Sequence, residues 1–324
     1  LLVPPFRADV QREIDVVEEI LRIYGFNTIN ASGKLSYSIT SFDEIDGEEI
    51  RNVVSDLLSN TGFQEAINNS LTKSDYKDFI SDLNIDERVK LLNPLSRDLS
   101  IMRQSLLFSG LENIAYNHNR KNSNIKFYEF GKIYSKTKNG YYENSRLQLL
   151  TSGKLFSENW NSDSKNVDFF FIKQKVEHVL TRLGVKNLRS EQINSNGFED
   201  AIIYKFKNLK LVSFGKLDQN LCRKFDIKSE VYAADFDWDL LIKISKFNCV
   251  KYRQVSKFPE VRRDLSLLLD KDISFDSLKK VALKVDNRIL NSVTLFDVYE
   301  GDKIPTQKKS YALSFVMSDK TKTL

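Results

Sequence analysis

The spacing of apolar residues divides this chain into three parts. Near the start, apolar residues recur every three or four positions from about Val10 to Tyr24, which predicts an amphipathic helix closed by Gly25. A polar, serine-rich connector follows over residues 31–46. A second helical pattern then runs over 48–60, and the sequence up to about residue 246 alternates helical with strand-like segments. We therefore expect an α+β domain over residues 47–246.

The last part of the chain, residues 254–324, has the pattern of a different small domain. Its order is strand, helix, strand, strand, with the four elements expected at 261–269, 274–285, 292–299 and 309–318. These are the first four elements of a βαββαβ ferredoxin-like unit, whose second helix and fourth strand are not in this sequence. Since the chain also lacks an initiator methionine, we expect a fragment of a longer polypeptide, cut at both ends.

Composition narrows the class of protein without defining its function. The chain has 324 residues, 41% of them apolar, and a formal charge of +5 that allows an RNA partner without requiring one. There is neither a signal peptide nor an apolar run of the ~20 residues that span a bilayer, so a cytoplasmic location is expected. The two cysteines, Cys222 and Cys249, and the two histidines, His118 and His178, are too scattered for a zinc site or a Ser-His-Asp triad.

Acidic residues gather on one face of the first predicted helix. At about 100° per residue, Asp15, Glu18 and Glu19 lie opposite the apolar stripe, and Asp9 comes shortly before the helix. From the spacing alone, a solvated helix face is the simpler interpretation. The alternative is a site for a hard cation, because oxygen-only ligands suit Mg²⁺.

Strand alternation in the last domain predicts one polar sheet face. Asp297 and Tyr299 should share that face with Ser266 and Ser310, whereas Phe296 and Val298 should point inward. The inward set also includes Tyr311, Leu313 and Phe315. A ring for stacking beside small polar groups and a carboxylate is typical of a surface that binds single-stranded RNA. Candidates for phosphate contact are Lys257, Arg262, Lys308 and Lys309, although solvation is the commoner role of such residues.

Three motifs occur in the order found in one known family. The three motifs are NPLSRDLSIMRQSLL (Asn93–Leu107), VYAADFDWDLL (Val231–Leu241) and KFPEVRRDLSLLL (Lys257–Leu269). These motifs resemble segments of the beta subunits of bacterial phenylalanyl-tRNA synthetases, and the resemblance covers the whole chain. It implies that residues 1–30 end the domain preceding the core. It further implies a class II aminoacyl-tRNA synthetase-like antiparallel sheet with helices over 47–246, and a partial ferredoxin-fold anticodon-binding domain over 254–324.

The same resemblance implies roles for the residues singled out above. In that family the pattern D-x5-D-x2-E-E supplies magnesium ligands, and Asp9, Asp15, Glu18 and Glu19 match all four positions. Water or a carboxylate of the alpha subunit would complete the coordination. The anticodon of tRNA-Phe would be contacted by Asp297, Tyr299, Ser310 and Ser266.

The resemblance also implies that the domain over residues 47–246 does not itself activate an amino acid with ATP. Where a catalytic copy tends to place arginines, this chain has Ser135 and Leu240, and Asp235 and Asp237 replace glycines that approach the nucleotide. Carboxylates repel a polyphosphate, so ATP would be bound by the alpha subunit and not by this chain.

The expected function is a non-catalytic part of phenylalanine–tRNA ligase, acting in an α2β2 complex with the alpha subunit and tRNA-Phe. The surface that pairs with the alpha subunit would be formed by Asn52, Val53, Leu57, Leu58 and the segment Met102–Leu111, unless these residues belong to the internal core. Segments that would proofread mischarged tRNA precede this region in the family, so editing is not expected here. The alternative is a degenerate synthetase-like interaction or RNA-binding protein without a role in charging.

Overall fold

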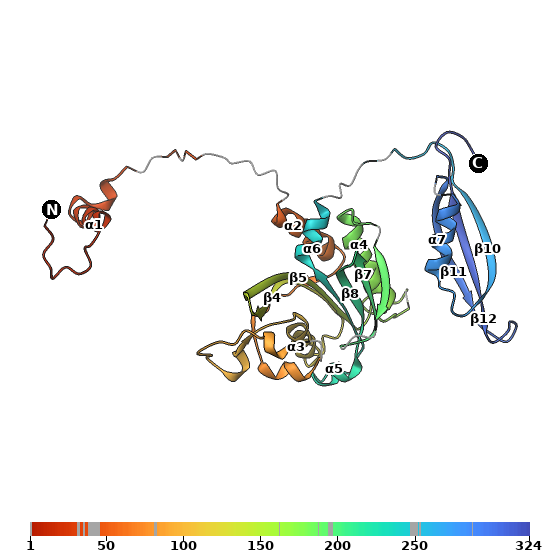
Figure 1. Ribbon diagram of the computed structural model, residues 1–324, viewed down its shortest axis with the longest axis horizontal. Helices are drawn as coiled ribbons and strands as arrows, with labels where there is room; N and C mark the ends of the chain where they lie inside the picture. The colour runs from red at the N-terminus through yellow and green to blue at the C-terminus, as the bar shows by residue number, and fades with distance from the viewer. Residues whose placement is uncertain are drawn as a thin grey trace.

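The computed structural model describes residues 2–324 except 31–32, 35, 38–45, 81–82, 162, 187, 194–196, 247–251, 253 and 287. Most of the connector expected at residues 31–46 lies outside the described residues, and so does Cys249. Three parts remain, at residues 2–30, 46–246 and 254–324, and each is described by itself (Figure 1). No helix in the described ranges has the length and apolar character needed to cross a membrane.

The first part contains one helix, α1 (Glu13–Tyr24), followed by a short 3-10 turn, η1 (Phe26–Thr28). The helix begins three residues later than the apolar spacing predicts, because Arg12 has an extended backbone with φ −117° and ψ 162°. It ends as predicted at Gly25, whose φ of 94° suits a residue without a side chain. The apolar stripe of α1 is uncovered in this structure, with Ile20 56% exposed.

The central part is built on a seven-stranded sheet in the order β1-β4-β5-β9-β8-β7-β6. In that order the strands are Gln64–Glu65, Ile125–Thr137, Gly140–Ser152, Val231–Asp237, Leu209–Leu217, Phe198–Phe206 and Arg189–Ile193. All neighbours are antiparallel except β1, which runs parallel to β4. A separate short pair joins β2 (Leu71–Thr72) to β3 (Ile101–Met102). The expected mixture of antiparallel sheet and helices is confirmed.

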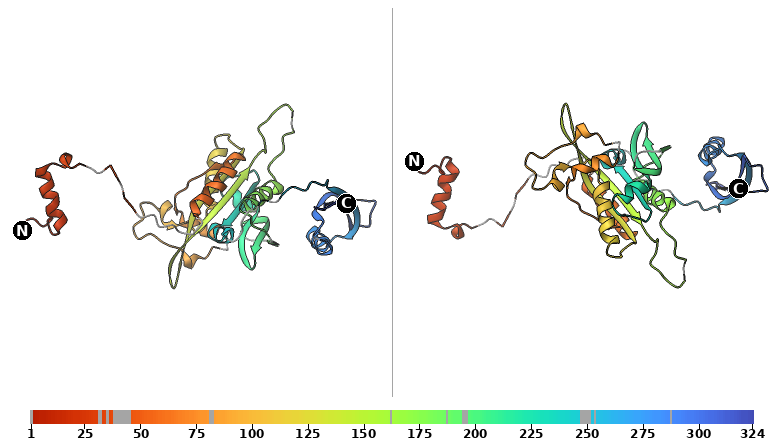
Figure 2. Two further views of the ribbon diagram at one scale, coloured as in Figure 1. Left: turned by 90° about the horizontal axis from the view of Figure 1, so that it is seen from above. Right: turned by 90° about the horizontal axis from the view of Figure 1, so that it is seen from below.

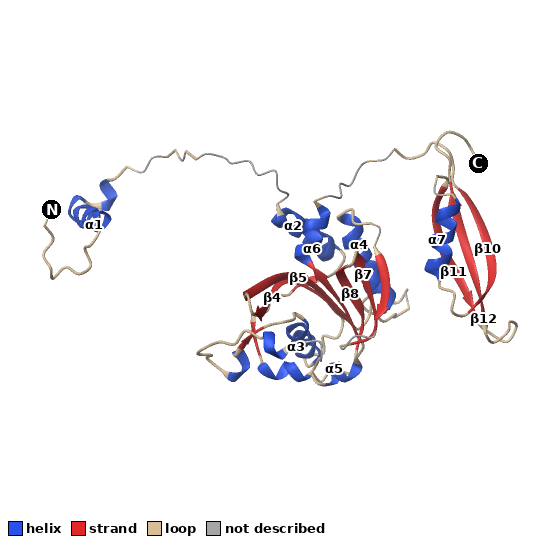
Figure 3. Ribbon diagram, viewed as in Figure 1, coloured by secondary structure: helices blue, strands red, loops and turns tan. Residues whose placement is uncertain are grey.

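Helices cover both faces of this sheet, so the central part has two apolar cores (Figures 1 and 3). One face carries α2 (Gly47–Asn60), α4 (Phe169–Arg182) and α6 (Trp238–Ser245), and the other carries α3 (Leu107–His118) and α5 (Gln219–Arg223). Alternation along β5 sends Leu149 into the first core and Leu150 into the second. Short 3-10 helices occupy the loops, namely η2 (Ser74–Asp78), η3 (Ile85–Glu87) and η4 (Arg97–Leu99).

Helix α2 follows its sequence pattern closely. The side chain of Asp46 accepts a hydrogen bond from the N–H of Glu48 at 2.9 Å and caps the helix start, and Gly62 follows its end with a φ of 90°. Leu58, which was a candidate for a partner surface, is only 1% exposed and belongs to the internal core. The same holds for Leu111 in α3, which is fully buried. For these two residues the internal-core interpretation is correct.

The last part has the four predicted elements in the predicted order. They are β10 (Val261–Asp270), α7 (Phe275–Val285), β11 (Leu290–Tyr299) and β12 (Lys308–Met317). The sheet order is β10-β12-β11, with both pairs antiparallel, and α7 packs against one face (Figures 2 and 3). Because a single helix covers that face, an apolar groove of about 390 Å³ stays open beside Leu313 and Phe315.

Candidate functional site

The face of the C-terminal sheet opposite α7 brings the four predicted RNA-contact residues together. On the central strand β12, Ser310 lies opposite Tyr299 of β11, and Ala312 lies between Asp297 of β11 and Ser266 of β10. The hydroxyl oxygens of Ser266 and Ser310 are 3.3 Å apart. The phenol of Tyr299 lies against Gly301, where a Cβ would come within 2.8 Å of its hydroxyl oxygen. This is an open patch of small polar groups with one ring at its edge.

A β-bulge adds a second ring to this face, which corrects the sequence prediction for Phe296. The pairing of β11 with β12 shifts between Leu295 and Asp297, so Phe296 has no cross-strand partner. An extra residue of this kind reverses the alternation locally. The ring of Phe296 is 53% exposed and lies 5.3 Å from the guanidinium carbon of Arg262, on the polar face instead of inward.

Two of the candidate phosphate-contacting residues have other partners. Arg262 binds the carboxylate of Asp264 through two hydrogen bonds of 2.8 and 3.1 Å, which lowers the pKa of Asp264. Lys309 is buried, and its Nζ donates to the carbonyl oxygen of Lys271 at 2.8 Å, above the ring of Tyr311. The expectation that Lys309 contacts phosphate is therefore wrong, because strand alternation places it on the covered face.

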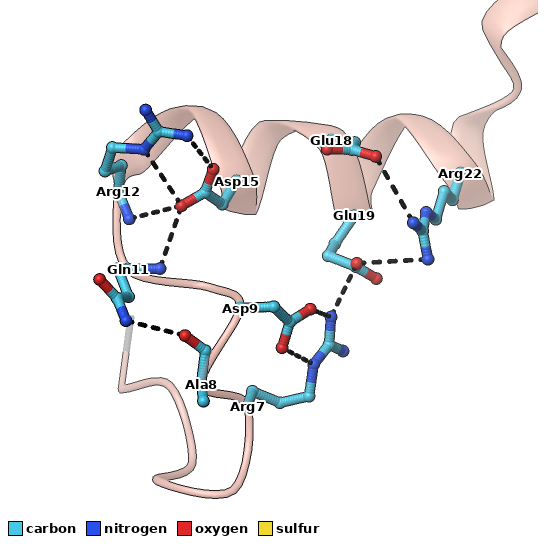
Figure 4. A network of polar contacts seen from close by, with 9 residues as sticks. All are labelled: Arg7, Ala8, Asp9, Gln11, Arg12, Asp15, Glu18, Glu19 and Arg22. Atoms are coloured by element: carbon cyan, nitrogen blue, oxygen red, sulfur yellow. Dashed lines mark hydrogen bonds and ion pairs between the residues drawn. The ribbon is translucent and has the colours of Figure 1, made fainter. Parts of the chain in front are cut away.

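The acids of the N-terminal part are held by arginines (Figure 4). Arg7 donates to both carboxylate oxygens of Asp9, at 3.0 and 2.8 Å, and to Glu19 at 2.8 Å. Arg22 lies 3.4 Å from both Glu18 and Glu19. The hydrogen bond from Arg7 is the main reason that the pKa of Asp9 is lowered to about 2. A guanidinium thus lies between Asp9 and Glu19.

Asp15 is turned toward the start of its own helix. Its Oδ2 accepts hydrogen bonds from the backbone N–H groups of Gln11 and Arg12, at 3.0 and 2.8 Å. A further hydrogen bond from the Arg12 side chain is the main cause of its lowered pKa. In the described part of the chain, no three acidic, histidine or cysteine side chains are arranged to hold a metal ion. The four acids supply the oxygen chemistry that Mg²⁺ prefers, but their arrangement here does not fit the ion.

In the central part, the sheet face under α3 is filled by the chain's own side chains. Glu129 of β4 forms an ion pair of 2.6 Å with Arg103, and both side chains are only 5% exposed. The Nδ2 of Asn68 donates to the second oxygen of Glu129 at 2.7 Å, and the Nε of Arg103 donates to the carbonyl oxygen of Lys132 at 2.9 Å. Gly131 makes room for Arg103, since a Cβ there would lie 2.3 Å from its Nη2. The cavity remaining beside Glu129 measures about 10 Å³.

The residues expected to replace nucleotide-binding groups have structural partners. Asp237 caps α6, accepting a hydrogen bond from the N–H of Leu240 at 2.9 Å. Asp235 lies 3.6 Å from Arg146, and burial raises the pKa of its carboxyl group. Leu240 packs against the core, and Ser135 lies in β4 opposite Tyr142. Sequence reasoning missed the buried pair of Arg103 and Glu129, because no local pattern marks two charges 26 residues apart as partners.

Comparison with known proteins gives matches along the whole chain. Residues 1–26 match a family model described as the tRNA synthetase B5 domain, and residues 39–238 match the phenylalanyl tRNA synthetase beta chain CLM domain. Residues 256–324 match the ferredoxin-fold anticodon binding domain. In a search of solved structures, a pyrrolysyl-tRNA synthetase from Desulfitobacterium hafniense has a similar fold. Its TM-score is 0.50 and its identity 15%, over 63% of this chain and 71% of that one.

Two curated relatives show which protein the chain resembles over its whole length. The chain is 43% identical to the phenylalanine–tRNA ligase beta subunit of Bacteroides thetaiotaomicron and 34% identical to that of Clostridium acetobutylicum. These alignments cover 100% and 99% of this chain, but only 41% and 40% of the two relatives. The chain thus spans about two fifths of the length of the relatives that it matches. It belongs to the phenylalanyl-tRNA synthetase beta chain family.

Proposed function

We propose that this chain serves phenylalanine–tRNA ligase as a non-catalytic part of the beta subunit. In this proposal it pairs with the alpha subunit in an α2β2 complex, contacts tRNA-Phe, and leaves ATP and phenylalanine to the alpha subunit. The central domain would be a class II synthetase-like fold retained for its shape. The observation that carries the proposal is the filled sheet face, where Arg103 and Glu129 leave a cavity of about 10 Å³.

Both the space beside Glu129 and the charges around this face disfavour a nucleotide. A cavity of about 10 Å³ holds one water molecule at most, so the space beside Glu129 has no room for a nucleotide. Opening it would break a buried ion pair, which costs about 3–5 kcal/mol when one partner is left alone. Asp235 and Asp237 add negative groups, where a polyphosphate requires positive ones. These features argue against nucleotide binding, so the proposal assigns the domain a packing role beside the alpha subunit.

A charging assay separates this proposal from the alternative function. We expect the chain to form a complex with the alpha subunit by multi-angle light scattering, and to change the rate at which that subunit charges tRNA-Phe. If the two proteins do not associate, or if association leaves charging unchanged, the alternative of an RNA-binding or interaction protein outside charging is favoured.

Replacing Tyr299 with alanine tests the proposed contact with the anticodon. If its ring stacks on a base, the variant should bind tRNA-Phe about 1–3 kcal/mol more weakly, a loss of roughly 5- to 150-fold in affinity. Fluorescence anisotropy with labelled tRNA-Phe measures the effect. The matched control is Tyr252→Ala, which removes a tyrosine that is 89% exposed and lies outside the sheet. Equal affinity for the wild type and a folded Tyr299→Ala variant would remove this residue from the site.

The acids of the first part are proposed as magnesium ligands only in the complex with the alpha subunit. Arginines hold these acids in ion pairs, and no three of the four carboxylates converge here. To bind one metal ion together, Asp9, Asp15, Glu18 and Glu19 would have to be released by the arginines and turn toward a common point. The isolated chain should therefore retain no stoichiometric Mg²⁺ after gel filtration.

Asp15→Asn tests the metal assignment within the complex. The variant should lower the metal content of the purified alpha–beta complex, as measured by atomic absorption. Glu13→Gln should not, since Glu13 is an exposed acid on the same helix outside the matched set. Unchanged metal in the Asp15→Asn complex would show the assignment to be wrong.

A further inference from the structure

A phenylalanine, an arginine and an aspartate form a cluster on the open face of the C-terminal sheet. The guanidinium carbon of Arg262 lies over the ring of Phe296, 5.3 Å from its centre. Two hydrogen bonds join the same guanidinium to Asp264. We propose that this cluster is a second stacking platform, which takes a base of tRNA-Phe other than the one at Tyr299. The inference rests on the proposed function and adds residues to the set that would contact the RNA.

Arg262 meets Phe296 across the middle of the sheet. The two residues belong to β10 and β11, and β12 lies between these strands. Neighbouring strands are about 4.8 Å apart, so the two side chains together bridge roughly 10 Å over the face opposite α7. The bulge makes this contact possible, because it turns Phe296 from the covered face to the open one. The open face therefore carries a guanidinium that is backed by an aromatic ring.

Asp264 fixes the orientation of the guanidinium. Its Oδ1 and Oδ2 accept hydrogen bonds from the Nε and Nη2 of Arg262, at 2.8 and 3.1 Å. Such a fork of two hydrogen bonds holds the planar group in one orientation. The carboxylate is held in turn from the central strand, since hydrogen bonds from Arg262 and then from Ser314, its cross-strand neighbour, lower the pKa of Asp264. The side chain of Arg262 nevertheless remains 59% exposed.

The charges of the cluster favour a base over a phosphate. The carboxylate of Asp264 lies at hydrogen-bonding distance from the guanidinium, so the pair has no net charge to offer to a phosphate. It offers instead a flat group held over a ring, and RNA bases stack on guanidinium planes as they do on aromatic rings. This role differs from the phosphate contact that the sequence suggested for Arg262.

The platform and Tyr299 would serve different nucleotides. A base inserted between two planes needs about 7 Å, twice the rise per base of a stacked strand, so none fits between Arg262 and Phe296. The base would therefore stack on the outer side of the guanidinium. Phe296 precedes Tyr299 by roughly 10 Å along β11. One base cannot reach both residues, so the platform would take another nucleotide of the same loop.

The test uses the whole 324-residue chain and a fluorescently labelled anticodon stem-loop of tRNA-Phe. Arg262→Lys keeps the charge but removes the plane, so we expect affinity to fall about 10-fold with no change in its salt dependence. Phe296→Leu should lose a similar amount, because the guanidinium no longer has a ring behind it. A phosphate contact gives a different result, since Arg262→Lys would then bind nearly as tightly as the wild type.

Asp264→Asn distinguishes stacking from simple charge attraction by the sign of its effect. The substitution removes a negative charge from a surface that faces a polyanion, so charge alone predicts tighter binding. If Asp264 positions Arg262 for stacking, the variant should bind the stem-loop several-fold more weakly. Tighter binding by Asp264→Asn would contradict the positioning role and overturn the proposal.

Stem-loops with abasic residues locate the nucleotide involved. Each loop nucleotide is replaced in turn by an abasic residue, and the affinity of each stem-loop is measured with the wild type and with Arg262→Lys. One replacement should weaken binding by the wild type about 10-fold but have little further effect on Arg262→Lys. That nucleotide should differ from the one whose removal no longer matters in Tyr299→Ala.

Arg120→Lys is the matched control, since Arg120 also lies over a ring, 3.4 Å from the centre of Tyr116, but on the central domain. It should bind the stem-loop like the wild type. The proposal is overturned if Arg262→Lys and Phe296→Leu, folded by circular dichroism, bind like the wild type while Tyr299→Ala binds more weakly. If the wild-type chain does not bind the stem-loop at all, the proposed anticodon contact fails together with this inference.

Discussion

Replacing Glu129 with alanine is expected to lower the free energy of unfolding by about 3–5 kcal/mol. The carboxylate is the partner of Arg103 at 2.6 Å and accepts a hydrogen bond from the Nδ2 of Asn68 at 2.7 Å. Without it, a guanidinium that is 5% exposed keeps its charge with no carboxylate beside it. Urea unfolding followed by circular dichroism measures the change, with the transition of the central domain read from tryptophan fluorescence.

An exposed ion pair on the same two strands provides the control. Lys132 and Glu143 join β4 to β5, and their side chains are 54% and 53% exposed. Removing an exposed pair usually costs about 1 kcal/mol or less, so Glu143→Ala should have a small effect. Similar losses for Glu129→Ala and Glu143→Ala would mean that the pair of Arg103 and Glu129 is not buried as described.

Adding a methyl group at Gly215 is expected to destabilise the central domain by about 1–3 kcal/mol. Gly215 lies in β8 opposite Ala201 of β7, close to a register shift in the pairing. A Cβ at this position would come within 2.0 Å of the carbonyl oxygen of Asp200 and 2.8 Å of the Cα of Ala201. These are backbone atoms of a neighbouring strand, so rotating a side chain cannot relieve the clash. Thermal and urea unfolding of Gly215→Ala both measure the effect.

Gly47→Ala is the matched control for this substitution. Gly47 is the first residue of α2, and the nearest atom to an added Cβ is the Cδ1 of Ile242, at an ordinary contact distance of 3.6 Å. Alanine should therefore be neutral or stabilise the domain by up to about 1 kcal/mol. If Gly215→Ala is as stable as Gly47→Ala, the close approach of β7 and β8 is not as described.

Much of the fold could be predicted from local patterns. The helix from Gly47 to Asn60 and the four elements of the last domain were found because their apolar spacing, caps and glycines all agree. Apolar spacing alone places the start of α1 three residues too early, because Asp15 caps the backbone at Arg12 although the spacing continues upstream. Side-chain capping can thus override periodicity at a helix end.

The sites were less predictable, because they depend on contacts between distant residues. The bulge at Phe296 leaves no mark in the alternation of polar and apolar residues, so alternation alone predicts the wrong face for this ring. Asp15, Glu18 and Glu19 lie on α1 and Asp9 precedes it, but the pairing of these acids with Arg7, Arg12 and Arg22 depends on side-chain conformation, which no local pattern predicts. The positions of Leu58 and Leu111 inside the core required the full arrangement of helices on the sheet.

The most direct measurement of the central claim is amino-acid-dependent exchange of pyrophosphate into ATP by this chain alone. A central domain whose sheet face is filled by Arg103 and Glu129 should give no exchange with phenylalanine and no heat of ATP binding by calorimetry. The alpha–beta complex, tested in parallel, should give both signals. Exchange by the isolated chain, or ATP binding that is lost in an Asp235→Ala variant, would contradict the account.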